Sequence, residues 1–266
     1  MTISDVPAMA TNPSCIFFTD FDGTITMRDS NDYLTDNLGF GYEKRRELNF
    51  AVLEERMTFR DAFQAMIDSV KGTNFPDAIQ ILCDNIQLDP YFKDFYEWSL
   101  QNNVPVVVVS SGLTDVIRGL LVHLLGPSAK QIQIVSNEVA DRPGSDRNQP
   151  GGWTIEFHDD SGFGHDKSLC IKPYHKIPNR PTLLYAGDGV SDLSAARETD
   201  LLFAKTGYDL VTYCERQGVP FTTFEDWKSI LETTREIVEG KKSVKKVAAE
   251  GVQAVHMNGN AVRTTK

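Results

Sequence analysis

Residues 17–26, Phe-Phe-Thr-Asp-Phe-Asp-Gly-Thr-Ile-Thr, decide the fold of this chain. The apolar residues Ile16 to Phe18 predict a short buried strand that leads into a pair of carboxylates. Asp20 and Asp22 are two residues apart, so on an extended strand their side chains point the same way at its carboxyl end. Ligands bind at that edge of open α/β sheets. Like charges held together beside a dry strand are costly unless a cation or a reaction uses them, so we interpret the pair as part of a chemical site.

Two further polar groups directly follow apolar segments that predict strands. Residues 106–109, four valines, run into Ser110-Ser111-Gly112, which supplies hydroxyls and a turn. Residues 182–185 run into Asp188 and Asp192, which lie one turn apart if a helix begins nearby. Each group is therefore expected at the carboxyl end of its own strand.

A lysine completes the set. Lys167 lies in the glycine-flanked loop 164–168 and is placed to open a helix. Carboxylates, a hydroxyl with nearby amides and a lysine together predict a site for Mg²⁺ and a phosphate, because Mg²⁺ takes few carboxylates and completes its octahedron with water and phosphate oxygens. The five histidines have no metal-ligand spacing, and we expect a structural role for His165.

These motifs resemble those of the haloacid dehalogenase superfamily of phosphatases. Its four motifs are DxDx(T/V), a strand that ends in Ser or Thr, a Lys, and GDxxxD, and the chain has them in that order. The segments DFDGTIT, SSGL and GDGVSDLSAA look most like the phosphoserine-phosphatase-like branch, especially methionine-salvage enolphosphate phosphatases and phosphocholine phosphatases. The residues that carry the resemblance are Asp20, Asp22, Thr24, Ser110, Lys167, Asp188 and Asp192.

The resemblance implies an α/β fold, with a Rossmann-like core built on a parallel sheet and an inserted helical cap of the C1 type. The residues agree, because a long interval with helical patterns over 43–55, 58–70, 77–86 and 91–101 separates the first strand from the next. We expect the cap at 27–89, the core at 1–26 and 90–240, and a C-terminal tail or peripheral helix at 241–266. A helical stretch within one undivided fold is the alternative.

The resemblance also implies a Mg²⁺-dependent phosphomonoesterase that works through an aspartyl phosphate. Asp20 would be the nucleophile, and Asp22 would protonate the leaving group and then activate water. Asp20, Asp188 and the backbone carbonyl of Asp22 would hold Mg²⁺. Haloacid dehalogenases, in which the matching aspartate attacks carbon, are the rival enzyme class. They need neither a metal nor the acid at Asp22, and this chain keeps both Asp22 and Asp188.

The other motif residues would bind phosphate or support the site. Ser110, Ser111 and Gly112 would hold phosphoryl oxygens, with backbone amides contributing. Lys167 would neutralise the charge between nucleophile and phosphate. Asp192 would orient Asp188, a bound water or Lys167.

The turn after Thr24 and the cap are expected to set the substrate. In phosphoserine phosphatases a Glu in that turn binds the amino group and a cap Arg binds the carboxylate. Here Asp29 stands at the Glu position, and Met66 and Ile67 stand where the Arg is expected, which argues against phosphoserine. Asp29 and Asp32 are the candidate specificity residues. A polyol, sugar or amino-alcohol phosphate is favoured, and a methionine-salvage enolphosphate is the alternative.

Composition limits the classes of partner. The formal net charge of −10 argues against a nucleic-acid partner, which requires a basic face. No apolar run approaches the roughly 20 residues that span a bilayer, and residues 1–13 do not read as a signal peptide. Cys15, Cys83, Cys170 and Cys214 are scattered, which favours a reducing, cytoplasmic compartment. The oligomeric state stays open. A catalytically weak protein that binds or senses phosphometabolites is the alternative from another class.

Overall fold

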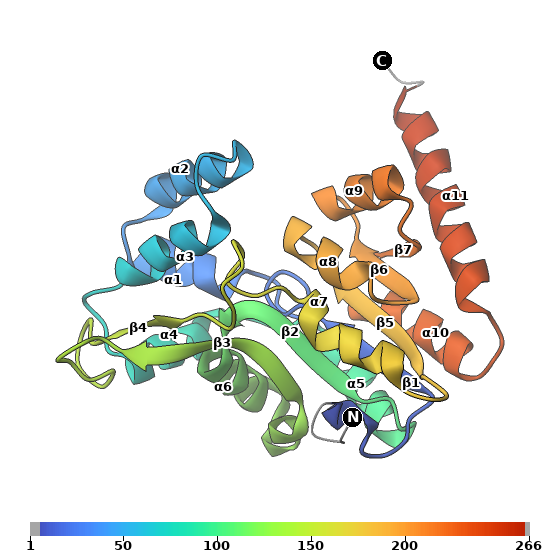
Figure 1. Cartoon of the computed structure of the whole chain (residues 1–266), viewed down its shortest axis with the longest axis horizontal. Coiled ribbons are helices and arrows are strands. Elements are labelled where there is room, and N and C mark those ends of the chain that lie inside the picture. Colours follow the sequence, from blue (N-terminus) through green and yellow to red (C-terminus); the bar gives the residue numbers. More distant parts are fainter. Residues whose placement is uncertain (1–5, 264–266) are drawn as a thin grey trace. The chain divides into compact units, whose positions relative to one another are not determined.

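The computed structural model describes residues 6–263, without the side chains of residues 190, 209 and 255–263 (Figure 1). The chain divides into two compact units. The first contains the described parts of Met1–Asp20, Asp89–Val107 and Lys167–Lys266, and the second contains Phe21–Leu88 and Val108–Asp166. One strand, β2 (Val106–Leu113), begins in the first unit and ends in the second.

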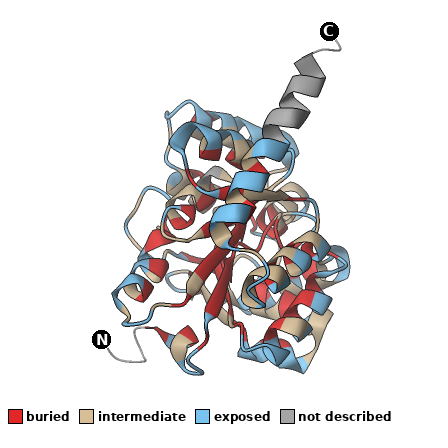
Figure 2. Cartoon of the chain, turned by 90° about the vertical axis from the view of Figure 1, so that its right-hand side faces the viewer, coloured by how far each residue is buried: buried red, intermediate tan, exposed pale blue. Residues whose placement is uncertain are grey.

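The first unit is built on a parallel sheet. Its strands, in the order β1-β5-β6-β7, are β1 (Cys15–Thr19), β5 (Thr182–Gly187), β6 (Leu201–Lys205) and β7 (Phe221–Phe224). The start of β2 borders β1, where the Phe17 amide donates to the Pro105 carbonyl over 2.9 Å. The strands are apolar along almost their whole length because both faces of a parallel sheet are covered, and the central strands are drawn as buried in Figure 2.

Helices accompany this sheet. Helix α10 packs against α5, and α11 packs along β7 (Figure 1). The rings of Phe17, Phe95 and Trp227 meet with centroids 4.7–5.6 Å apart, which joins β1 to α5 and α10 in one aromatic core. The helices of this unit are α5 (Phe92–Gln101), α7 (Ser168–Ile171), α8 (Leu193–Ala196), α9 (Asp209–Gln217), α10 (Trp227–Val238) and α11 (Val244–Arg263), with short 3₁₀ turns at Pro7–Met9, Lys172–Lys176 and Val190–Asp192.

The second unit combines helices with an antiparallel hairpin. The end of β2 borders β3 (Gln133–Asp141), which pairs with β4 (Trp153–Glu156). Trp153 on β4 packs on Phe75 with ring centroids 5.0 Å apart, which fixes the hairpin to the start of a helix. The helices are α1 (Ser30–Leu38), α2 (Tyr42–Leu53), α3 (Phe59–Asp68), α4 (Phe75–Asn85) and α6 (Thr114–Leu125), with a 3₁₀ turn at Pro127–Gln131.

The predicted α/β class and most predicted elements are confirmed. The four helices expected between residues 43 and 101 are α2 to α5, and Thr58 caps α3 by accepting from the Asp61 amide. One boundary was wrong: the strand expected to end in Ser110 and a turn continues to Leu113. The Asn137 amide side chain donates to the Ser111 carbonyl over 2.6 Å, so this segment is held extended by a partner outside the local sequence. Helices α1 and α6 and strand β7 were not predicted.

The C-terminal segment contains a helix, α11, rather than only a tail. Residues 264–266 of the predicted tail lie outside the described residues. The predicted boundaries of the cap at 27–89 and the core stay a prediction. The contacts group 21–88 with 108–166, so the helices expected in the cap share their unit with the β3–β4 hairpin.

Candidate active site

In the first unit, a buried lysine lies between two aspartates. Lys167 Nζ is 2.9 Å from Asp20 Oδ2 and 2.7 Å from Asp192 Oδ1. Asp20 directly follows β1, where its amide donates to the Ala186 carbonyl of the neighbouring strand β5. Lys167 precedes α7 and is fully buried. Three segments remote in sequence therefore bring these charges together inside one unit.

Asp192 receives four hydrogen bonds. Its Oδ1 accepts from Lys167 Nζ and from the Tyr185 hydroxyl, each over 2.7 Å. Its Oδ2 accepts from the amides of Asp188 and Gly189 over 3.1 and 3.0 Å. A carboxylate offers about four lone-pair positions, so these donors occupy Asp192. This arrangement is typical of a residue that orients its neighbours, and not of a metal ligand.

Gly187 leaves the space in which the Asp192 carboxylate reaches its hydrogen-bond donors. A Cβ atom at position 187 would lie 2.5 Å from the carboxyl carbon of Asp192. Any side chain there would displace Asp192 from Tyr185 and Lys167. The glycine of the GDxxxD motif is therefore required by packing against the last aspartate of the same motif.

The carboxyl groups of Asp20, Asp188 and Asp192 together carry more negative charge than the single positive charge of Lys167 balances. One carboxylate oxygen each of Asp20, Asp188 and Asp192 lies within 4.8 Å of the others. Burial raises the pKa of Asp20 well above its usual value, and the charge of Asp192 adds to this rise while Lys167 opposes it. Burial lowers the pKa of Lys167, but the charges of Asp192 and Asp20 outweigh it and raise that pKa overall. Such a cluster attracts a cation.

In the second unit, Asp22 is held at the start of α1. Its Oδ1 accepts from the Ser30 amide over 2.7 Å, and its Oδ2 accepts from Asn31 Nδ2 over 2.9 Å. Gly112 approaches the same carboxylate, because a Cβ at that position would lie 3.2 Å from Asp22 Oδ2 and 3.3 Å from Ser110 Oγ. The second unit therefore brings Asp22, Ser110 and Gly112 together.

The Ser110–Gly112 segment has its own support. The Gly112 amide donates to Ser110 Oγ over 3.0 Å, and the Ser110 carbonyl lies 2.8 Å from His165 Nδ1. His165 is buried, and its ring packs on that of His158 with centroids 4.3 Å apart. These contacts support the expected structural role of His165.

The two candidate specificity residues have intramolecular partners. Asp29 Oδ1 accepts from the amides of Asn31 and Asp32 and caps α1. Asp32 Oδ2 is 2.6 Å from Arg45, a buried guanidinium that also pairs with Asp36. Both aspartates thus stabilise the helix that positions Asp22.

Sequence patterns missed two side chains of the site. Tyr185 reads as a buried strand residue, and only the tertiary structure brings its hydroxyl to Asp192. Asn31 lies in a polar segment without a periodic signal. Asp29, which Ser30 and Asn31 follow, is the cap of α1 and was the available clue.

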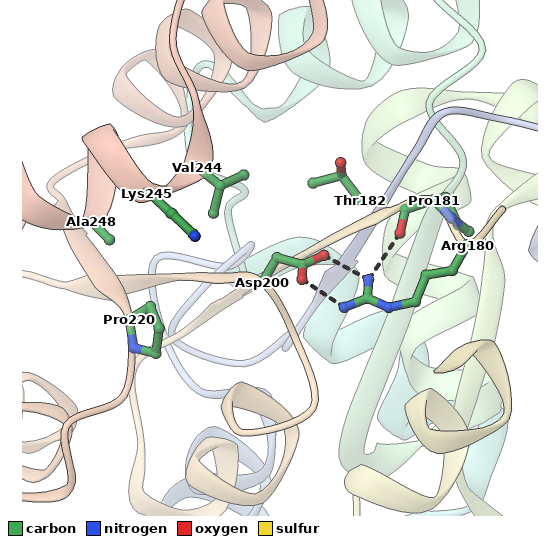
Figure 3. A pocket seen from close by; sticks show the side chains of 8 residues that line it. All are labelled: Arg180, Pro181, Thr182, Asp200, Pro220, Val244, Lys245 and Ala248. Atoms are coloured by element: carbon green, nitrogen blue, oxygen red, sulfur yellow. Dashed lines mark hydrogen bonds and ion pairs between the residues drawn. The ribbon is translucent and has the colours of Figure 1, made fainter. Parts of the chain in front are cut away.

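A separate pocket of about 620 Å³ lies at the opposite ends of the strands of the first unit (Figure 3). Thr182 begins β5, and Asp200 and Pro220 precede β6 and β7, so the pocket borders the amino ends of these strands. Arg180 makes a two-pronged ion pair with Asp200 there. The carboxylate cluster lies at the carboxyl ends and is not part of this pocket.

Among the described residues, no helix is both long enough and apolar enough to cross a membrane.

Comparisons with known proteins point to the family that the motifs resemble. The model of the haloacid dehalogenase-like hydrolases matches residues 17–197. "Polyol phosphate phosphatase PYP1" of Saccharomyces cerevisiae is 50% identical over 238 residues, which cover 86% of this chain and 96% of that protein. A 2-hydroxy-3-keto-5-methylthiopentenyl-1-phosphate phosphatase of Lysinibacillus sphaericus is 25% identical, over 86% of this chain and 97% of that protein.

A solved structure gives the same fold. A substrate-bound phosphoserine phosphatase matches with a TM-score of 0.63 at 15% identity, over 84% of this chain and 98% of that one. At that identity the likeness shows the fold, the Rossmann-like α/β fold that the motifs predict. The family match and the 50% identical relative together show that this chain belongs to the haloacid dehalogenase-like hydrolases and is a phosphatase of that family.

Proposed function

We propose that this protein is a Mg²⁺-dependent phosphomonoesterase that hydrolyses a small polyol phosphate through an aspartyl phosphate on Asp20. The observation that carries the proposal is the cluster of Asp20, Asp188 and Asp192, in which buried Lys167 pairs with Asp20 and Asp192. The 50% identity to a polyol phosphate phosphatase over nearly the whole relative supports the substrate class.

The donor set of the cluster fits Mg²⁺. The ion prefers a few hard carboxylate oxygens and keeps further positions for water and phosphate. Hydrogen bonds already occupy the carboxylate of Asp192. The carboxylates that would hold the ion are therefore those of Asp20 and Asp188. The backbone carbonyl of Asp22 is the third ligand that the family resemblance implies. When bound, the ion would neutralise phosphate charge and so let an anionic nucleophile approach an anionic substrate.

The chain's own residues would then divide the chemistry. Asp20 Oδ attacks phosphorus, a P–O bond forms to the carboxylate, and the bond to the substrate alcohol breaks. Asp22 gives its proton to the departing alkoxide and afterwards takes one from the water that hydrolyses the aspartyl phosphate. Lys167 balances charge at Asp20 and is itself held by Asp192. Ser110, Ser111 and Gly112 would hold phosphoryl oxygens.

The proposal extends to substrate class and setting. We keep Asp29 and Asp32 as candidate specificity residues that act through α1. Buried Met66 and Ile67 offer no charge to a substrate carboxylate, which supports a substrate without one. The net charge of −10 disfavours nucleic acid, and the scattered free cysteines support a cytoplasmic location.

A substrate panel with purified protein tests this function. Phosphate release from glycerol phosphate, sorbitol phosphate, phosphoethanolamine, phosphoserine, an enol phosphate and an aryl phosphate is compared with Mg²⁺ and with EDTA. We expect Mg²⁺-dependent turnover with polyol phosphates ahead of phosphoserine. Turnover that EDTA leaves unchanged would contradict the mechanism. A phosphorylated enol as the best substrate would favour the methionine-salvage alternative, to which the 25% identical relative points. Absence of turnover on the whole panel would favour a binding or regulatory protein.

A further inference from the structure

The first turn of α1 carries two buried polar atoms that have no hydrogen-bond partner. Ser30 Oγ and Asn31 Oδ1 make no hydrogen bond with the described residues, although the two residues are only 1% and 8% exposed. An unpaired buried polar group costs about 1–3 kcal/mol. Because the cost falls beside the carboxylate proposed as the general acid, a ligand that completes these bonds is the natural explanation.

Asp22 fixes the orientation of the Asn31 amide. Asn31 Nδ2 donates to Asp22 Oδ2 over 2.9 Å, and a carboxylate in that position accepts rather than donates. The carbonyl end of the amide is therefore the end left for another group. Gly112 lies against the same atoms, because its Cβ would be 3.2 Å from Asp22 Oδ2 and 3.5 Å from Asn31 Nδ2. Because Oδ1 belongs to the same amide group as Nδ2, Asn31 presents a hydrogen-bond acceptor close to Asp22.

The surrounding charges favour a neutral donor. An ammonium group bound here would need a carboxylate of its own, because a buried cation without one is costly. Asp29 Oδ1 already accepts from two amides as the cap of α1, and Asp32 is paired with Arg45. A hydroxyl needs only an acceptor and can also bond to another hydroxyl such as Ser30 Oγ. These contacts select a polyol over an amino alcohol.

We propose that Asn31 is a specificity-determining residue whose Oδ1 accepts a hydrogen bond from the substrate hydroxyl next to the phosphoester, with Ser30 Oγ assisting. The proposal rests on the proposed function, since it requires Asp22 to face the leaving alcohol. It gives Asn31 two separate tasks: Nδ2 holds Asp22 for every substrate, and Oδ1 reads a hydroxyl that only some substrates have.

A pair of substrates separates the two tasks. Glycerol 1-phosphate carries a hydroxyl next to the phosphoester, and propyl phosphate is the analogue without hydroxyls. We expect Asn31→Ala to lower kcat/KM for both, because Asp22 loses a donor. The ratio of kcat/KM for glycerol 1-phosphate to that for propyl phosphate should also fall by about tenfold, the loss of one hydrogen bond of about 1.4 kcal/mol. Gly112→Ala is the matched control. It crowds Asp22 without removing the acceptor, so it should lower both activities and keep the ratio.

A second variant guards against a folding defect. Ser30→Ala removes the unpaired hydroxyl but keeps the Ser30 amide that binds Asp22, and we expect it to lower the ratio by about threefold, for loss of part of one such bond. Because the hydroxyl is unpaired in the free protein, this variant should also keep or raise the Tm.

The outcomes separate the inference from the function on which it rests. Wild-type protein that hydrolyses both substrates, with Asn31→Ala and Ser30→Ala lowering them in parallel, would overturn the inference alone. An equal selective loss on phosphoethanolamine would overturn the choice of a hydroxyl over an ammonium. Wild-type protein inactive on all of these substrates would instead overturn the proposed function.

Discussion

Lys167 Nζ lies 2.7 Å from Asp192 Oδ1, and both side chains are completely buried. This pair is the fixed part of the cluster, because the Tyr185 hydroxyl and two backbone amides also hold Asp192. Asp20 approaches the same ammonium from the end of β1. The ion pair of Lys167 and Asp192 thus presents a positive charge to Asp20, whose position is set by the sheet.

Asp20→Asn and Asp192→Asn should have opposite effects on stability. Burial and repulsion from Asp192 raise the pKa of Asp20, so a neutral amide at position 20 relieves that cost and should keep or raise the free energy of unfolding. Asp192→Asn breaks a buried pair with Lys167 and should lower it by about 3–5 kcal/mol. Both variants should lose at least about 10³-fold in kcat. Urea unfolding with parallel kinetics measures both quantities. Equal destabilisation by the two variants would show that Asp20 is as structural as Asp192.

Tyr185→Phe isolates the support of Asp192. It removes one of the donors to Oδ1 and should cost roughly 1–2 kcal/mol of stability, with a smaller loss of kcat than Asp192→Asn. Tyr174→Phe is a matched control in the same unit, since the buried Tyr174 hydroxyl accepts from the Ala8 amide away from the carboxylates. That control should lose stability but not activity. Equal kcat values for the two variants would show that Tyr185 does not support catalysis through Asp192.

Mg²⁺ should stabilise the protein through Asp188. Protein stripped of metal should show a Tm that rises with added MgCl₂, by the equivalent of about 2.7 kcal/mol at a hundred times the Kd. Asp188→Asn should abolish most of this rise. Asp200→Asn is the control, because Asp200 pairs with Arg180 at the opposite ends of the strands and should leave the rise intact. An undiminished rise in Asp188→Asn would place the ion elsewhere.

The loop that precedes Lys167 should make stability depend on acid pH. Burial raises the pKa of Asp159, but the amides of Asp166 and Ser161, which donate to its carboxylate, outweigh this and lower the pKa to about 2. Because the unfolded pKa is about 3.9, the stabilisation is complete above about pH 5 and is lost as the pH falls toward 2.

Asp159→Asn should therefore be less stable than wild type at pH 6, with a difference that shrinks below pH 4. Denaturant titrations from pH 6 to pH 2.5 measure the difference. The exposed Asp160 offers the control variant Asp160→Asn, which should track wild type throughout. A difference that stays constant with pH would mean that the amide donors do not act through the charge of Asp159.

The sequence predicted the parts of the site that lie at strand ends. Asp20 and Asp188 follow apolar segments that predict strands, and the structure makes these strands neighbours, with Phe18 paired with Tyr185. Lys167 was recognisable only from the order of the motifs, because a lysine in a polar loop carries no burial signal. Its burial depends on Asp192, which is remote in sequence.

The missed elements have physical reasons. Helix α1 has no continuous apolar face and forms because Asp29 caps it and its first turn binds Asp22. Strand β7 is short and half polar, and its pairing with β6 supplies the stabilisation that its residues lack. The contact between Asn31 and Asp22 joins a turn to a helix start, a relation that no periodic pattern encodes.

The most direct test of the central claim is to find the phosphoryl group on Asp20. Wild-type protein and Asp22→Asn are quenched in acid during turnover of a polyol phosphate, digested and analysed by mass spectrometry. The proposed mechanism predicts that the peptide containing Asp20 gains the mass of one phosphoryl group, that hydroxylamine removes it, and that it accumulates in Asp22→Asn because hydrolysis slows. Asp20→Asn should carry none. A phosphoryl group on another residue, or full turnover by Asp20→Asn, would contradict the claim.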